Sequence, residues 1–309
     1  MEFNHIPIMV PEVLEGLNIK PEGTYVDGTA GGGNHSFAIG SKLSQKGKLI
    51  CVDRDQEAIK ACTEKIKPLI CQKEVIHSAF NLIPEILEEK NIKIDGLLVD
   101  LGVSSHQLSK AERGFSYMQD GLLDMRMNSE DSISAKDIVN NYSQEALEKI
   151  FFEYGEERYS RRIAENIIKK RSVQPINTTF ELVDIIKEAM PAKALREKQH
   201  PAKRIFQAIR ISVNEELFQI SSLLENIIPY MNSGGRITVI TFHSLEDKIV
   251  KAAFNRFEKP CVCPPDFPVC VCGKKPLGHA VGKPKTPSAE EIEQNPKSRS
   301  SRLRVFEIV

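Results

Sequence analysis

Residues 25–36 read YVDGTAGGGNHS, in which a short apolar run ends in an acid, Asp27, and three consecutive glycines follow. Such a glycine-rich turn between a strand and a helix lets the backbone approach a ligand closely. A nucleotide phosphate, a dinucleotide or a sulfonium cofactor can each bind at a turn of this kind. The rest of the chain has to decide among them.

The pattern on both sides of this turn predicts an α/β fold. Apolar runs typical of buried strands occupy residues 24–27, 48–53, 74–80 and 94–102. Helical spacing of apolar residues lies between them, at residues 37–43, 55–66 and 81–90. Continuous apolar strands that alternate with helices are typical of a parallel sheet covered on both faces.

The pattern changes near residue 109, and helical signals then dominate as far as residue 214. Strand signals return at residues 234–244 and 303–309. We therefore expect one Rossmann-like sheet domain, formed by residues 1–109 and 215–309, with a helical insertion at 110–214 after its fourth strand. Within the insertion, Thr178 and Glu181 are placed to cap a helix. Residues 261–296, rich in Pro, Gly and Lys, are expected to form an extended excursion.

The residues after the glycines argue against phosphate binding. A P-loop needs a Lys and a Ser or Thr after its last glycine, whereas Asn34, His35 and Ser36 follow Gly33 here. A dinucleotide site needs Gly-x-Gly-x-x-Gly, and the match that starts at Gly31 ends in Ser36. Phosphoryl transfer is therefore disfavoured, and the dinucleotide match is weak.

Two acids favour a different cofactor. Asp27 precedes the glycines, where it would repel a pyrophosphate and attract a positive group; the simpler alternative is that it caps the following helix. Asp53 ends the second predicted strand, where a carboxylate can bind both ribose hydroxyls of an adenosine. S-adenosylmethionine combines an adenosine with an ammonium and a sulfonium and has no phosphate, so it fits this pair of acids best.

Charge is unevenly spread along the chain, although 42 basic and 42 acidic residues cancel overall. Residues 1–109 carry 11 basic and 15 acidic residues, whereas residues 154–210 carry 13 and 7 and residues 259–309 carry 9 and 5. The basic later segments suit an anionic partner, with solvated helix faces as the alternative. No signal peptide and no run of roughly 20 apolar residues is evident, which predicts a cytoplasmic protein without a membrane span.

The seven cysteines include two Cys-x-Cys pairs in CVCPPDFPVCVC, residues 261–272. Four thiolates so closely spaced can reach one tetrahedral Zn2+. The alternatives are two redox-labile disulfides or plain thiols, and the sequence leaves these readings of Cys261, Cys263, Cys270 and Cys272 open. The scattered Cys51, Cys62 and Cys71 suit a reducing compartment.

Residues 97–127, LLVDLGVSSHQLSKAERGFSYMQDGLLDMRM, resemble the signature of the bacterial 16S ribosomal RNA cytosine-N4-methyltransferase family, also called MraW or RsmH. NHIPIMVPEVLEGL near the start, TFHSLEDKIVK and the tail NPKSRSSRLRVFE resemble the same family, so the likeness spans nearly the whole chain. It implies a Rossmann-like, S-adenosylmethionine-dependent methyltransferase with a helical insertion for RNA. It also implies the substrate, the N4 amino group of cytosine 1402 in the decoding region of small-subunit rRNA.

The resemblance also implies site residues. It places the cofactor against the glycine loop, its ribose on Asp53 and its adenine beside Phe80, and the full implied set is Gly33, Asn34, His35, Asp53, Phe80, Asp100 and Gln107. Family members commonly carry a small residue and then Gly where this chain has Gly33 and Asn34. Because Asn tolerates the left-handed conformation, we expect the loop to keep its shape.

The chemistry needs an acceptor that holds the weakly nucleophilic amine in line with the methyl group. Asp100, at the end of the fourth strand, is the first candidate catalytic residue, and His243 is the second; a lone His is more often structural. Arg113, Phe115 and Arg126 are candidates for binding an unstacked cytidine. The competing readings are a silent rRNA-binding or assembly factor and a nicotinamide-dependent oxidoreductase. A monomer and a homodimer both remain open.

Overall fold

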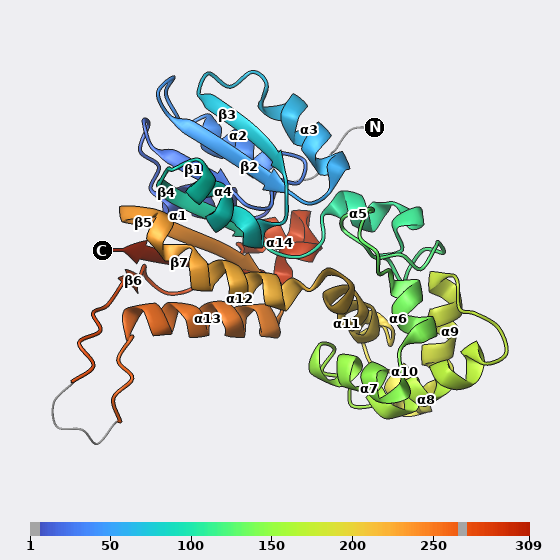
Figure 1. The fold of residues 1–309 in the computed structure, drawn as a ribbon. Coiled ribbons are helices and arrows are strands. Elements are labelled where there is room, and N and C mark those ends of the chain that lie inside the picture. The colour runs from blue at the N-terminus through green and yellow to red at the C-terminus, as the bar shows by residue number, and fades with distance from the viewer. Residues whose placement is uncertain (1–6, 265–270) are drawn as a thin grey trace. The chain divides into compact units, whose positions relative to one another are not determined.

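The computed structural model of the protein describes residues 7–264 and 271–309 (Figure 1). The chain divides into two compact units. The first, here called the sheet unit, combines Met1–Gly102 with Leu217–Val309, and the second, the helical unit, is Val103–Glu216. Among the described residues, no helix is both long and apolar enough to cross a bilayer.

The sheet unit is built on a mixed seven-stranded sheet with the order β3-β2-β1-β4-β5-β7-β6. Its strands are β1 Thr24–Asp27, β2 Lys48–Asp53, β3 Gln72–His77, β4 Ile94–Asp100, β5 Met231–Thr241, β6 Gly278–Ala280 and β7 Arg302–Ile308. The first five are parallel to one another, whereas β7 is antiparallel to both β5 and β6. All the carboxyl ends of the parallel strands therefore lie at one edge, where open α/β folds bind their ligands.

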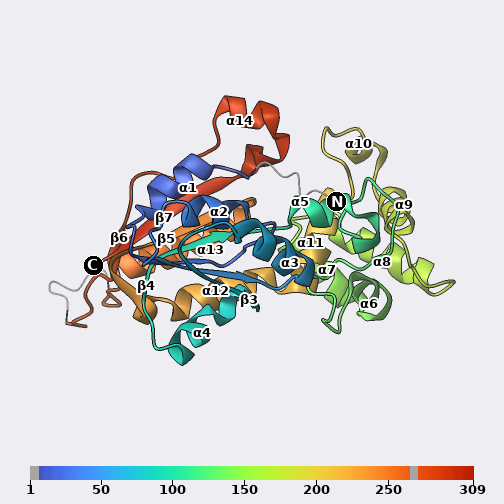
Figure 2. The same cartoon turned by 90° about the horizontal axis from the view of Figure 1, so that it is seen from above.

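Helices cover both faces of the sheet, as the apolar strands predict. Neighbouring residues of a strand pack in different cores: Tyr25 lies in one and Val26 in the other. Figure 2 shows α1 and α4 on opposite sides of the sheet. The helices of this unit are α1 Val10–Leu17, α2 Asn34–Gly40, α3 Gln56–Ile66, α4 Ile83–Glu89, α12 Glu216–Asn226, which begins at the junction, α13 Ser244–Glu258 and α14 Ala289–Gln294, with short 3-10 turns at Phe80–Leu82, Ile228–Tyr230 and Pro296–Ser300.

The helical unit has a separate hydrophobic core, formed by buried residues such as Leu147, Phe151 and Ile186. Its helices are α5 Ser105–Ser109, α6 Ala135–Asn141, α7 Gln144–Glu153, α8 Ser160–Arg171, α9 Thr179–Ala189, α10 Ala192–Leu195 and α11 Lys203–Asn214, with a 3-10 turn at Ala111–Arg113. The expected cap is confirmed at the start of α9. There the Thr178 hydroxyl accepts from Glu181 N at 3.3 Å, and Glu181 Oε2 accepts from Thr178 N at 3.0 Å.

The predicted strands are confirmed, with boundaries that shift by a few residues. The expectation of a plain extended excursion at residues 261–296 was wrong for its second half, which contains β6 and α14. Three residues are too few to show an alternating pattern, and β6 exists because it pairs with β7, at Gly278↔Ile308 and Ala280↔Phe306.

Candidate functional site

Three carboxylates end three adjacent parallel strands. Asp27 ends β1, Asp53 ends β2 and Asp100 ends β4, and the order β2-β1-β4 places them side by side at one edge of the sheet. The sequence brings them there because each follows an apolar run that is buried in the sheet. This edge is the natural place for a ligand in a Rossmann-like fold.

The glycine loop, residues 28–33, joins these strand ends. Gly28 N donates to Leu98 O of β4 at 2.8 Å, and Ala30 N donates to Val52 O of β2 at 3.0 Å. The left-handed conformations fall on Gly31 and Gly33, with φ of 50° and 79°. Asn34 does not use the left-handed conformation that asparagine tolerates, because it is the first residue of α2 and Gly33 is the N-cap.

Asp27 supports the loop from beneath. It has no exposed surface, its Oδ2 accepts from Ser36 Oγ at 2.6 Å, and its Oδ1 accepts from Thr29 N at 3.2 Å. Burial raises the pKa of Asp27 above its usual range, against the opposing effect of the Ser36 hydroxyl. The structure therefore corrects both readings of Asp27: it does not cap α2, and its carboxylate is enclosed rather than turned to a positive ligand.

Asp53 shapes the loop while keeping lone pairs for a ligand. Its Oδ2 accepts from Gly31 N at 2.7 Å and its Oδ1 from Asp55 N at 2.9 Å. Each carboxylate oxygen can accept a second hydrogen bond, so capacity for two ribose hydroxyls remains. Desolvation raises the pKa of Asp53 to about 6, despite the hydrogen bonds from the Asp55 and Gly31 backbone.

Phe80 stands in the first turn after β3, in the 3-10 segment Phe80–Leu82, and is half-buried. It borders the start of the glycine loop: a Cβ placed on Gly28 would lie 3.5 Å from Phe80 Cβ and 2.9 Å from Ile83 Cδ1. Only glycine allows so close an approach without displacing these side chains. Phe80 thus supplies an apolar wall beside the strand end that carries Asp27.

Asp100 and His35 form a polar pair inside this edge. His35 Nε2 lies 3.6 Å from Asp100 Oδ2, and both His35 ring nitrogens are buried without a hydrogen-bond partner among the described residues. Asp100 Oδ1 is likewise buried and has no partner within the part of the chain that the structure describes. Burial lowers the pKa of His35, but the Asp100 carboxylate and, more weakly, Asp27 outweigh it, so this pKa is raised overall.

Asp100 is also tied to the glycine loop, because Asp100 N donates to Thr29 Oγ1 at 2.6 Å. An unsatisfied buried acceptor costs about 1–3 kcal/mol, so it marks a position where a ligand donor would be favourable. Asp100 Oδ1 is such an acceptor, at the strand end where the sequence predicts the reacting amine to bind.

The remaining predicted site residues have structural roles. Gln107 lies in the helical unit, where its Oε1 accepts from Ser104 N at 3.1 Å and caps α5; a contact with the cofactor stays a prediction. His243 is the N-cap of α13, and its Nδ1 accepts from Glu246 N at 3.4 Å. Its Nε2 lies 3.1 Å from Oε1 of the fully buried Glu246. This favours the structural reading of His243 and leaves its catalytic role a prediction.

The three candidates for binding a cytidine are engaged within the helical unit. Phe115 is buried in the helical core at 5% exposure, so it cannot stack on a base without unpacking. Arg126 forms a forked pair with Asp124, through Nε at 3.0 Å and through NH2 at 2.7 Å. Arg113 NH2 donates to the carbonyl oxygens of Arg126 and Met127 at 3.0 and 2.9 Å. These residues therefore fold the signature segment on itself.

The basic run of the helical unit is only partly neutralised. Arg171 donates hydrogen bonds to the carbonyl oxygens of Val139 and Tyr142, and Lys170 forms an ion pair with Glu188 at 2.7 Å. Six basic side chains are exposed and, among the described residues, lie within ion-pair distance of no carboxylate: Arg162, Lys169, Lys193, Arg196, Lys198 and Lys203. Four of them fall between residues 193 and 203. This cluster, called here the α10 basic segment, is a candidate surface for a polyanion.

The second basic stretch, near the end of the chain, is largely internal to the sheet unit. Arg304 forks onto Asp247 of α13, with Nε at 2.7 Å and NH2 at 3.0 Å, and Arg302 NH1 joins at 2.9 Å. The Arg304 hydrogen bond, with the nearby positive charges, holds the pKa of Asp247 below its usual range. Lys297 and Arg299 remain exposed and form no ion pair in the described part of the chain.

Sequence reasoning overlooked two hydroxyls that fix the loop. Thr29 connects Asp27 to Asp100, since its N–H donates to the first and its hydroxyl accepts from the backbone of the second. Ser36 donates to Asp27 from the position where a dinucleotide site would have its last glycine. The available signal was the Asp27-x-Thr29 spacing, which favours an Asx-type turn directly after a strand.

This fold and this edge define a Rossmann-like α/β protein with a cofactor loop of the kind used by methylases. The sequence profile of the MraW methylase family matches residues 2–309, and the chain belongs to this family.

Curated relatives agree with the profile. A protein named ribosomal RNA small subunit methyltransferase H, from Clostridium botulinum (strain 657 / Type Ba4), is 54% identical over 309 residues, which is 99% of both chains. Its counterpart from the Loch Maree strain is also 54% identical over the same shares. A solved rRNA methylase from Streptococcus thermophilus is 11% identical, covers 97% of this chain and 93% of its own, and has a TM-score of 0.42; so remote a likeness carries no argument.

Proposed function

We propose that this protein transfers a methyl group from S-adenosylmethionine to the N4 amino group of one cytidine of 16S rRNA, cytosine 1402 in the decoding region. Family membership and relatives named as small-subunit rRNA methyltransferases support the reaction class. The observation that carries the chemistry is the buried Oδ1 of Asp100 at the carboxyl edge of the sheet, which has no hydrogen-bond partner among the described residues. The substrate places the enzyme in the bacterial cytoplasm with the small ribosomal subunit.

The sheet edge fits this cofactor. Asp53 accepts the ribose hydroxyls with its remaining lone pairs, and Phe80 flanks the adenine. The loop at Gly33, Asn34 and His35 follows the methionine portion, and Gln107 contributes from the helical unit. Among the described loop residues no lysine is placed to neutralise a phosphate, and the Asp100 carboxylate favours a cationic ligand over an anionic one.

The amine of cytosine is a weak nucleophile because its lone pair is delocalised into the ring. The cofactor, when bound, supplies an electrophilic methyl group. Asp100 Oδ1 accepts a hydrogen bond from the amine and holds its nitrogen lone pair toward the methyl carbon. The N–C bond would form as the S–C bond breaks, leaving the sulfur as a neutral thioether, and the proton released from the amine would pass to Asp100 Oδ1 and from there to solvent. His35, beside Asp100 Oδ2, is the positioning residue that fixes the other carboxylate oxygen.

The α10 basic segment and the exposed Lys297 and Arg299 supply phosphate contacts for the RNA. Non-specific attraction of this kind orients a polyanion without reading its sequence. The choice of one cytidine then depends on extrusion of the base toward Asp100, since modified bases are taken out of the stack.

The test uses the full-length protein, radiolabelled S-adenosylmethionine and small subunits isolated from cells that lack this enzyme. We expect label at the N4 position of one cytidine, detected by nucleoside mass spectrometry, and about a 100-fold or greater loss of turnover in Asp100→Asn with cofactor affinity within a few-fold of wild type. Absence of label on both subunits and naked 16S rRNA, with RNA binding retained, would instead establish the silent binding or assembly factor. Full activity of Asp100→Ala would remove Asp100 as the acceptor.

A further inference from the structure

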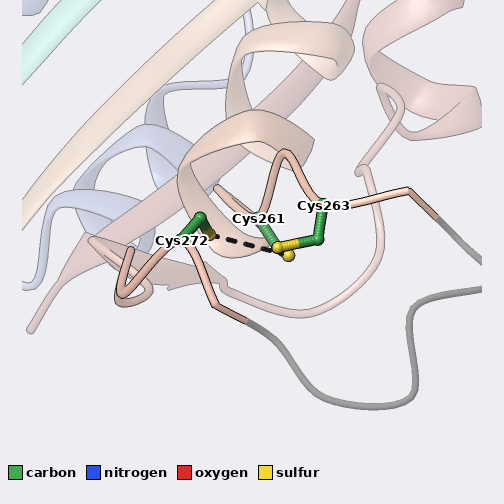
Figure 3. A group of neighbouring side chains, drawn as sticks. All are labelled: Cys261, Cys263 and Cys272. Atoms are coloured by element: carbon green, nitrogen blue, oxygen red, sulfur yellow. Dashed lines mark hydrogen bonds between the residues drawn. The ribbon is translucent and has the colours of Figure 1, made fainter.

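The cysteines of the segment between α13 and β6 converge. The sulfur atoms of Cys261, Cys263 and Cys272 all lie within 4.8 Å of one another, and Figure 3 shows the three side chains turned toward a common point. The fourth cysteine of the motif, Cys270, lies outside the described residues. Cys272 lies eleven positions after Cys261 in the sequence, so their sulfur atoms are close because the chain folds back on itself.

The sulfur spacing suits thiolates around one metal ion. Cys272 Sγ and Cys261 Sγ are 3.8 Å apart. In a tetrahedral site with Zn–S bonds of about 2.3 Å, the edge between two sulfurs is about 3.8 Å long. A disulfide needs about 2.05 Å and would use only two of the three sulfurs. One sulfur pair at this separation, with the third sulfur within 4.8 Å of both, is the arrangement expected of a shared ligand sphere.

The described residues of the segment that carries the cysteines form no apolar core that would hold them together. Every described residue of 259–277 is exposed or half-buried, and the large apolar side chains described there, Val262, Val271 and Leu277, are 67%, 72% and 39% exposed. Its base is closed by a hydrogen bond from Leu277 N to Phe257 O at 2.9 Å. Small segments without an apolar core usually depend on a disulfide or a metal for their shape.

We propose that Cys261, Cys263 and Cys272 bind one Zn2+ as thiolates, in a structural site outside the methyl-transfer centre. Soft sulfur donors select zinc over the hard cations Mg2+ and Ca2+. The ion would link the segment that follows α13 to the segment that precedes β6. It would therefore fix the segment before β6, which carries the exposed Lys259, Lys274 and Lys275.

The test is metal analysis of the full-length, untagged protein, purified without chelator under reducing conditions. We expect about one equivalent of zinc, with about three sulfur ligands near 2.3 Å by X-ray absorption. The double variant Cys261→Ser/Cys263→Ser is expected to lose at least about nine-tenths of it. Cys71→Ser is the matched control, because Cys71 precedes β3 at the opposite edge of the sheet, and it should keep the metal.

Proteolysis gives a second readout that does not depend on catalysis. Chelation should make residues 259–277 cleavable several times faster in wild type and leave the double variant unchanged, while methyl transfer by the intact protein persists. Less than about half an equivalent of zinc, sulfur-poor coordination, or zinc retained by the double variant would overturn the proposal. So would an intramolecular disulfide found by mass spectrometry in freshly purified protein.

Discussion

Asp100 Oδ2 lies 3.6 Å from His35 Nε2, and the His35 side chain is buried whereas that of Asp100 is 23% exposed. The carboxylate therefore has one oxygen beside a ring that can carry positive charge and one oxygen, Oδ1, with no partner in the described chain. If Asp100 is the acceptor that we propose, this arrangement would orient its carboxylate before the substrate binds. Preorganised acceptors need little rearrangement during the reaction.

The His35–Asp100 pair should make stability depend on pH. The pKa of His35 is raised in the folded protein, chiefly because Asp100 outweighs the effect of burial. A raised histidine pKa stabilises the fold fully below the unfolded value of about 6.5, and the contribution disappears as pH rises through the folded pKa. We expect His35→Asn to lower the melting temperature more at pH 6 than at pH 9. A constant difference across this range would contradict the pairing.

Cofactor binding should weaken in mild acid because of Asp53. Its pKa of about 6 means that the carboxylate gains a proton between pH 7 and pH 5 and loses acceptors for the ribose. We expect calorimetric affinity for S-adenosylmethionine to fall about tenfold over that interval. Asp53→Asn should bind about 10- to 100-fold more weakly at pH 7.5, as for a lost hydrogen bond to a charged group, and show a smaller pH dependence than wild type. Equal pH profiles for the two proteins would exclude Asp53 as the titrating group.

Gly33→Ala should destabilise the loop for two reasons, a steric clash of the added Cβ and an unfavourable left-handed backbone conformation. Gly33 has φ of 79°, and a Cβ there would lie 3.0 Å from Cys62 Cα. We expect a loss of about 2–3 kcal/mol in denaturant unfolding. Gly282→Ala is the control, because φ is 67° and no atom lies within 4 Å of the added Cβ. It should cost only about 1 kcal/mol and leave cofactor affinity unchanged.

The α10 basic segment should contribute to RNA binding through charge. Replacing Lys193, Arg196, Lys198 and Lys203 by Ala removes four exposed cations. Each phosphate contact to single-stranded RNA changes the salt slope by about 0.7, so we expect the slope of log K against log salt to fall by roughly 3. Fluorescence anisotropy with a 16S rRNA fragment measures this.

Two exposed lysines of the sheet unit, Lys42 and Lys60, provide the control for that experiment, since both form no ion pair among the described residues. Their replacement by Ala should change the slope by less than about 1. An unchanged slope in the fourfold variant, with normal helical content, would mean that this segment is a solvated surface.

The parallel part of the sheet is predictable from sequence because burial on both faces leaves continuous apolar runs. Val26 and Tyr25 pack in different cores, so both faces of the strand are buried. The short β6 leaves no such trace, because it depends on hydrogen bonds to β7 that join residues distant in sequence. The local pattern of apolar residues predicts which strands are buried, but it does not predict which strands pair with each other.

The same distinction applies to the candidate site. The position of Asp53 at the end of β2 was predictable because it directly follows an apolar run; its contact with a cofactor stays a prediction. The degree of burial of Asp27 was not predictable, since only the fold shows that Ser36 and Thr29 take both of its oxygens. Likewise, Arg126 and Phe115 are a cation and an aromatic ring in a signature segment, yet Asp124 and the helical core occupy them.

The pairing of β4 with β5 also bears on how the chain folds. Asp100 lies opposite Ile240, about 140 residues further along the chain, with the whole helical unit between them. Closing so long a loop is entropically costly, whereas the helices of the inserted unit form from nearby contacts. We therefore expect the inserted helical unit to become compact early in folding and β4 to pair with β5 late. The strand that positions Asp100 would then be among the last elements to become ordered, so that catalytic competence arrives only with the completed fold.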